Sequence, residues 1–249
     1  MEFHQYRKKF IVYAKSYLCG NEQVDRNILL KLAHTQRVCS LAERIVTSEG
    51  FSGFDEKTIM FSALFHDVSR FEQLKLFRTY RDADSFDHGD KAAEMLENRV
   101  FDLKCLSAEE FECVVTAVRL HNKRTIPADS AAAVKVVRDA DKLDIFSVVL
   151  DELDFPSNPD VVYNLSCERR FSDKVIGCVK NRTSPSHSDL ETVDDFVVSK
   201  LAWVYDLNTL SARRIFLESG YLERLRKHLP QSNVTDEIFD EANRYLRGE

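Results

Sequence analysis

Glycine and proline are scarce in this sequence, with 7 glycines and 5 prolines among 249 residues. Typical proteins contain about 7 per cent glycine and about 5 per cent proline. β-sandwiches, β-barrels and nucleotide-binding folds with glycine-rich loops need many tight turns, so this composition argues against all three. The sequence therefore predicts a nearly all-helical chain, of the all-α class.

Long apolar runs and an excess of positive charge are also lacking. No stretch approaches the ~18 uninterrupted apolar residues of a membrane span, and Lys15 interrupts the apolar run near the N-terminus. The 35 basic residues are outnumbered by 41 acidic residues, which gives a net charge of −6. A protein that binds duplex nucleic acid usually has the opposite balance. We therefore expect neither a membrane nor duplex nucleic acid as a partner, while the oligomeric state cannot be read from the sequence.

The six cysteines include no CxxC pair. A chain of this length can bury a sizeable core without disulfides, and reduced thiols are typical of intracellular proteins. We therefore expect reduced, mostly buried thiols and a cytoplasmic location.

Apolar residues recur with a helical period, and no alternating strand pattern of convincing length is present. Gly50 is predicted to end one helix, and Asp87 and Ser107 are predicted to cap the start of two others. Residues 70–87 are expected to form a long loop or a broken helix. The expected helices cover approximately residues 3–18, 25–49, 55–68, a stretch from 88, 108–122, 129–150, 190–205, 210–229 and 235–246.

No linker-like stretch divides the chain. We therefore expect one all-helical domain over residues 1–249, with a core over residues 25–150 and additional C-terminal helices packed on it as a cap over residues 151–249.

Histidine and aspartate occur where apolar helix faces become polar. His34 shares a predicted face with Val38 and Ile45, and Asp141 interrupts an apolar stripe that includes Val137. An isolated buried carboxylate is costly, so such groups are normally paired or bound to metal. Imidazoles and carboxylates that converge from separate helices would suit Zn²⁺, Mn²⁺ or Fe²⁺ better than Ca²⁺, which prefers oxygen ligands alone.

The strings AHTQRV, ALFHDVSRF and RDADKLD contain His34, His66-Asp67 and Asp141. Together they resemble the H…HD…D signature of the HD-domain superfamily of metal-dependent phosphohydrolases. His88 and His121 extend the pattern to H…HD…H…H…D, which is similar to a two-metal branch that includes phosphodiesterases and diiron oxygenases. The motifs span about residues 25–150, and the segment beginning LAWVYDLNTL is similar to the tail of uncharacterised bacterial HD-domain proteins.

This resemblance implies a divalent transition metal as cofactor, with one or two ions of Mn, Fe, Co, Ni or Zn, or of Mg. One ion would be bound by His34, His66, Asp67 and Asp141, and a second by His88, His121 and the bridging Asp67. Some members of the superfamily keep the extra histidines around a single metal ion, so the resemblance implies either one ion or two.

Basic and polar residues near the motifs are candidates for contacts with a phosphorylated substrate. The predicted catalytic residues are Asp67, Arg70 and Lys142. The predicted substrate contacts are Arg70, Arg119, Asn122 and Lys142, and a solvated helix face remains the alternative interpretation for the basic ones. The aspartates at positions 82, 84, 87 and 90 are interpreted as loop and cap residues rather than as an ion site.

The function that follows from the resemblance is a metal-dependent phosphohydrolase. Its predicted partner is a small phosphorylated molecule, such as a nucleotide or a related phosphoester, attacked by metal-activated water. Two alternatives remain open at this point: an O₂-dependent diiron oxygenase and a non-catalytic nucleotide-binding module.

Overall fold

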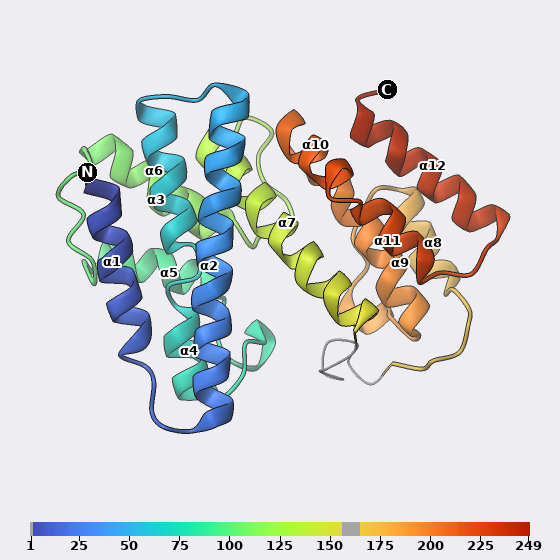
Figure 1. Ribbon diagram of the computed structural model, residues 1–249, viewed down its shortest axis with the longest axis horizontal. Helices are drawn as coiled ribbons and strands as arrows, with labels where there is room; N and C mark the ends of the chain where they lie inside the picture. Colours follow the sequence, from blue (N-terminus) through green and yellow to red (C-terminus); the bar gives the residue numbers. More distant parts are fainter. Residues whose placement is uncertain (1, 156–164) are drawn as a thin grey trace. The chain divides into compact units, whose positions relative to one another are not determined.

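A computed structural model describes residues 2–155 and 165–249 of the chain (Figure 1). This described part is built from α-helices and two 3-10 turns, and its only β-type pairing is an isolated bridge between Ser166 and Thr192. The all-α prediction is therefore confirmed. Within these residues, no helix has both the length and the apolar character that a membrane-spanning segment needs.

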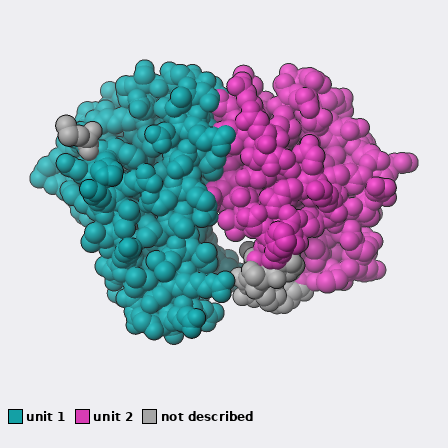
Figure 2. All heavy atoms as spheres, in the orientation of Figure 1, with its two compact units in different colours: residues 1–141 teal, residues 142–249 magenta. Residues whose placement is uncertain are grey.

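The chain divides into two compact units, residues 1–141 and residues 142–249 (Figure 2). The boundary falls within helix α7 (Ala132–Asp154). The other elements of the first unit are α1 (Glu2–Lys15), α2 (Glu22–Glu49), α3 (Phe54–Phe65), α4 (Arg70–Phe77), η1 (Asp82–Asp84), α5 (His88–Glu97) and α6 (Ala108–Leu120). The second unit contains α8 (Asp173–Lys180), η3 (His187–Asp189), α9 (Val193–Val204), α10 (Leu210–Glu218), α11 (Tyr221–Lys227) and α12 (Asn233–Arg247). The expected single domain with a cap from residue 151 stays a prediction.

The helices of the first unit pack through aromatic side chains. Helix α3 contacts α1, α2 and α6, and α5 packs against α6. Phe10 of α1 meets Phe65 and Phe71 edge to face, with ring centroids 5.9 and 5.7 Å apart. All three rings are fully buried. Edge-to-face packing is favourable for aromatic rings, so this cluster fixes α1 against the start of α4 and the end of α3.

Local capping explains several helix ends in the first unit. Gly50 ends α2 in the left-handed conformation, with φ 75°, and glycine takes this conformation without a steric penalty. Asp87 caps α5 by accepting a hydrogen bond from the Asp90 backbone. Ser107 and Glu110 form a capping box at the start of α6. These three predictions are confirmed.

Other helix boundaries differ from those that the sequence predicts. The first helix ends at Lys15, and the third ends at Phe65 because residues 66–69 form turns before α4 begins. Residues 70–87 form a broken helix, α4 followed by η1, which is one of the two forms that were expected. Helix α7 begins at Ala132, not at Asp129.

In the second unit, the predicted helix over residues 210–229 is two helices. Gly220 has φ 66° and separates α10 from α11, because a left-handed residue ends the helical hydrogen-bond pattern. The short helix α8 was not predicted. It is anchored by Asp195 of α9, whose carboxylate accepts hydrogen bonds from the backbone and the hydroxyl of Ser172 at 2.8 and 2.5 Å.

Candidate metal centre

Five elements of the first unit bring the six predicted ligands together. His34 lies in the middle of α2, and His66 is the residue that ends α3, with Asp67 directly after it. His88 is the first residue of α5, and His121 ends α6. Asp141 lies on α7. The four histidines and Asp67 are buried, while the Asp141 side chain keeps 17% of its surface exposed.

The first group of ligand atoms comprises His34, His66, Asp67 and Asp141. The two histidine Nε2 atoms lie 3.3 Å apart. Asp67 Oδ2 is 3.4 Å from His34 Nε2 and 3.5 Å from His66 Nε2. Asp141 Oδ1 approaches the same two nitrogens at 3.1 and 3.8 Å. His34, His66 and Asp67 are close enough to hold one metal ion, and Asp141 is placed to join them.

The second group comprises Asp67, His88 and His121, which can also hold a metal ion. The Nε2 atoms of His88 and His121 lie 3.1 Å apart, and His88 Nε2 is 3.7 Å from Asp67 Oδ1. Asp67 thus directs Oδ2 toward the first group and Oδ1 toward the second. A carboxylate shared in this way is the arrangement that bridges two metal ions.

The hydrogen bonds on the far side of the rings favour metal binding. His66 Nδ1 lies 2.9 Å from the Ala63 carbonyl, and His121 Nδ1 lies 2.6 Å from the Val118 carbonyl. His88 Nδ1 lies 2.5 Å from the Asp82 carboxylate. Each acceptor fixes a proton on Nδ1, so each neutral ring turns the lone pair of Nε2 into the centre. Lone pairs that face one another at 3.1 Å repel unless a cation lies between them, so the donor set fits a metal ion.

Burial keeps two of the four rings, those of His66 and His121, neutral. Desolvation lowers the pKa of His66, although the charges of Asp67 and Asp141 oppose it. Desolvation lowers the pKa of His121 well below its ordinary value, and the neighbouring His88 adds to this effect. Because metal ions bind the neutral imidazole, this environment prepares both residues as ligands at neutral pH.

The carboxylates of the centre are ionised. Burial by itself raises the pKa of Asp67, but nearby positive charge, above all that of Lys31, outweighs burial and holds this pKa well below its ordinary range. For Asp141, the hydrogen bond with His34 likewise outweighs burial and lowers the pKa. The centre therefore combines the neutral nitrogens of His66 and His121 with anionic oxygens, the donor mixture of Zn²⁺, Mn²⁺ and Fe²⁺ sites.

Two cations contact opposite oxygens of Asp67. Lys31 Nζ donates to Oδ2 at 2.7 Å, and Arg70 Nε donates to Oδ1 at 3.3 Å. Arg70 was predicted from the sequence, whereas Lys31 was not. The signal was present, because Lys31 precedes His34 by one helical turn on α2 and so shares its face.

Arg138 also supports the centre. Its guanidinium is buried, and Nη1 donates hydrogen bonds to the carbonyls of Leu120, His121 and Lys123 at 3.1, 2.9 and 2.7 Å. All three carbonyls lie at or just beyond the last residue of α6, where the helical hydrogen-bond pattern ends. Arg138 therefore fixes the backbone that carries His121.

The predicted substrate contacts lie in different surroundings. Asn122 is next to the centre, and its Nδ2 donates to Asp87 Oδ1 at 2.9 Å and lies 3.2 Å from His88 Nδ1. Arg119 forms an ion pair with Glu97 at 2.8 Å on the surface, which does not favour a role at the centre. Lys142 forms an ion pair with Asp206 at 2.8 Å in the second unit, and its substrate contact stays a prediction.

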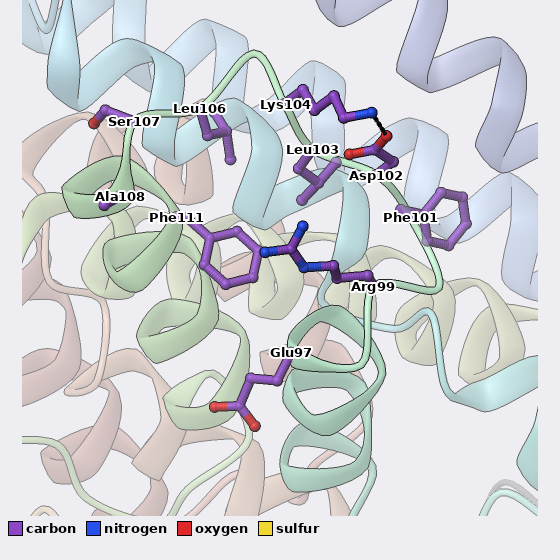
Figure 3. Close-up of a pocket in the computed structure, with 10 residues that line it drawn as sticks. All are labelled: Glu97, Arg99, Phe101, Asp102, Leu103, Lys104, Leu106, Ser107, Ala108 and Phe111. Atoms are coloured by element: carbon purple, nitrogen blue, oxygen red, sulfur yellow. Dashed lines mark ion pairs between the residues drawn. The ribbon is translucent and has the colours of Figure 1, made fainter.

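A separate cavity of about 350 Å³ lies between the end of α5 and the start of α6 (Figure 3). Phe101, Leu103 and Phe111 give it an apolar lining, and Arg99 is drawn beside Phe111. None of the six candidate ligands lines this cavity. It is therefore distinct from the candidate metal centre.

Comparison with known proteins agrees with the geometry of the site. Residues 32–145, somewhat less than half of the chain, match the HD domain family. No curated protein and no solved structure matches the chain. The matched region includes all six candidate ligands. The HD family consists mostly of metal-dependent phosphohydrolases. Residues 32–145, the region that contains the candidate metal centre, therefore form an HD domain.

Proposed function

We propose that this protein is a metal-dependent phosphohydrolase acting on a small phosphorylated metabolite, such as a nucleotide or a related phosphoester. The observation that carries the proposal is the placement of Asp67, with Oδ2 facing His34 and His66 and Oδ1 facing His88. One carboxylate between two histidine pairs fits a centre for two ions of Mn, Fe, Co, Ni or Zn. Such ions, when bound, activate water and offset the charge of a phosphoryl group.

The protein residues hold this centre in place before substrate binds. Carbonyl and carboxylate acceptors fix the orientation of three imidazole rings, so little reorganisation is needed during the reaction. Burial of the histidines and of Asp67 limits the access of bulk water and strengthens electrostatic interactions. These are the conditions under which charge that develops on phosphoryl oxygens is best stabilised.

Lys31 is better placed than Arg70 to contact a substrate phosphate. Arg70 directs Nη1 to Gln73, the Tyr80 carbonyl and Asp82, and its Nη2 lies 3.3 Å from His88 Nε2. With Nε on Asp67 and Nη1 on three acceptors, most of its donors are engaged within the protein, and only Nη2 lies beside a candidate ligand.

Lys31 makes a single described hydrogen bond, to Asp67, and its side chain is 22% exposed. An ammonium has three donors, so Lys31 can keep this bond and also donate to a phosphoryl oxygen. We therefore assign the substrate contact to Lys31 and a positioning role to Arg70.

The test is hydrolysis by purified protein loaded separately with Mn²⁺, Fe²⁺, Co²⁺ and Ni²⁺. A panel of nucleoside monophosphates, cyclic nucleotides and sugar phosphates is assayed for phosphate release and for diester opening. We expect metal-dependent turnover that is unaffected by the removal of O₂.

Asp67→Ala is expected to abolish this turnover while the helical circular dichroism remains. The matched control is Asp84→Asn, because Asp84 lies in η1 with an exposed side chain paired to Arg81, and it should retain activity. Metal-loaded protein that is inert on the whole panel, or an Asp67 variant as active as the control, would contradict the proposal.

A further inference from the structure

Asp82 was expected to be a loop or cap residue, but the structure places its carboxylate beside His88. It lies in η1, between α4 and α5, with a side chain that is 32% exposed. Its Oδ2 accepts from His88 Nδ1 at 2.5 Å and lies 3.4 Å from the His88 backbone nitrogen. Its Oδ1 accepts from Arg70 Nη1 at 2.8 Å and from Gln73 Nε2 at 3.1 Å. Both oxygens therefore face donors.

The three histidines whose Nδ1 contacts are described differ in what orients them. His66 and His121 use carbonyls three residues earlier in their own chain segments, Ala63 and Val118. These acceptors are part of the adjoining helices and are fixed by helix geometry. His88 uses the carboxylate of Asp82, which helix geometry does not fix. The orientation of His88 therefore depends on where the η1 segment holds Asp82.

Arg70 and Gln73 provide this placement. Both side chains extend from α4, and both donate to Asp82 Oδ1. Gln73 is fully buried, and its Nε2 also donates to Ser85 Oγ at 2.7 Å. Because Arg70 also donates to Asp67 Oδ1, it links the shared carboxylate to the carboxylate that orients His88.

We infer that Asp82 is a positioning residue for the second ion of the centre, the ion facing Asp67 Oδ1, His88 and His121. This inference rests on the two-ion arrangement of the proposed function. A carboxylate behind a ligand imidazole fixes the tautomer and raises the basicity of the metal-binding nitrogen. The first ion position is formed by His34 and His66 with Asp67, and the second by His88 and His121 with Asp67, so the two positions depend on different histidines.

The substitution Asp82→Asn has a defined consequence. The amide replaces one acceptor oxygen by an NH₂ group, yet both sides of Asp82 offer donors. If the NH₂ group faces His88, the proton of the imidazole moves to Nε2 and removes the lone pair that a metal needs. If it faces Arg70 and Gln73 instead, the side chain loses its anchor. Either arrangement weakens the second position and leaves the first in place.

The experiment measures ion binding by full-length protein rather than activity. Mn²⁺ is titrated into metal-free protein, with elemental analysis of the ions retained and electron paramagnetic resonance to detect coupled Mn²⁺ pairs. We expect wild-type protein to bind two ions per chain and to show the coupled signal. Asp82→Asn should bind the first ion with unchanged affinity and the second about 10–100-fold more weakly, with loss of the coupled signal.

Two further variants separate positioning from a merely structural role. Asp84→Asn, in the same 3-10 turn, is the matched control and should bind both ions like wild type. Asp82→Glu keeps the carboxylate and should restore part of the affinity for the second ion. If Asp82→Asn does not fold, the affinity of Asp82→Glu for the second ion is compared with that of wild type instead.

The inference is overturned by wild-type protein that binds only one ion. It is also overturned if Asp82→Asn retains both ions with unchanged affinity, if Asp84→Asn loses the second ion equally, or if Asp82→Glu restores nothing. Protein that binds two ions in this Asp82-dependent way but hydrolyses no substrate would contradict the proposed function alone.

Discussion

Replacing the buried Lys200 of α9 by methionine is expected to stabilise the protein at neutral pH. The Lys200 residue is 8% exposed, and its Nζ lies 4.2 Å from the ring centroids of both Phe196 and Trp203. Desolvation lowers the pKa of Lys200 from 10.5 to about 8. The ammonium is therefore charged at pH 7 in an environment that disfavours charge.

The magnitude follows from this difference in pKa. A change from 10.5 to about 8 corresponds to about 3 kcal/mol, at roughly 1.4 kcal/mol per pKa unit. Attraction between the ammonium and the two ring faces offsets about 1 kcal/mol of this cost. Methionine has a similar length and carries no charge. We therefore expect Lys200→Met to raise the free energy of unfolding by about 2 kcal/mol at pH 7.

The gain should depend on pH with a definite sign. Below pH 8 the lysine is protonated in both states, and folding carries the full cost of burying its charge. Between pH 8 and 10.5 the folded protein releases the proton while the unfolded chain keeps it, so the wild-type free energy of unfolding rises with pH. The advantage of Lys200→Met should therefore shrink as pH rises through this window.

The assay is urea unfolding at pH 7 and at pH 10. Trp203 is the only tryptophan of the chain and lies beside Lys200, so its fluorescence reports on this unit. Lys227→Met, at an exposed lysine of the same unit, is the control and should change little at either pH. The reasoning is refuted if Lys200→Met is less stable than wild type at pH 7, or if its gain is the same at both pH values.

Two further predictions concern the candidate metal centre. Lys31→Met should raise KM for the substrate about tenfold or more while metal content stays the same, because a hydrogen bond from a charged donor is worth about 1.5–3 kcal/mol. Lys75→Met, at an exposed lysine, is the control. An unchanged KM in Lys31→Met would contradict the assignment of Lys31 to the substrate site. Gly89→Ala should lower stability by about 1–3 kcal/mol in urea unfolding, because the added Cβ would lie 2.4 Å from Asn122 Oδ1 and 3.0 Å from the Arg119 carbonyl. A free energy of unfolding equal to that of wild type would contradict this prediction, because it would mean that Asn122 and the Arg119 carbonyl can move aside at no cost.

The candidate ligands could be found from the sequence because their signals are local. His34 follows the helical period of its own helix, and His66-Asp67 is a contiguous pair at a helix end. Caps such as Asp87 and Ser107 depend on residues only three positions away. Such signals do not predict a helix end that depends on the conformation of a single residue. At Gly220, a left-handed φ divides one predicted helix into two.

The roles of the surrounding charges could not be found in this way. Lys31 and Asp67 are 36 residues apart, and their contact exists only because α2 packs against α3. Arg119 forms an ion pair with Glu97, a contact made by the packing of α5 on α6, and its role at the substrate stays a prediction. Asp82 reaches His88 through an irregular segment that carries no periodic signal.

The sequence by itself determined the all-α class and several caps, because helix formation and capping depend on residues within a few positions of one another. The six candidate ligands followed from the resemblance of the H…HD…H…H…D pattern to the HD-domain superfamily. Only the tertiary structure decided that Asp67 faces two histidine pairs, that Arg70 is committed within the protein while Lys31 keeps free donors, and that Asp82 orients His88. Those outcomes depend on distances of a few ångströms between separate helices, which packing and the pairing of buried charge determine.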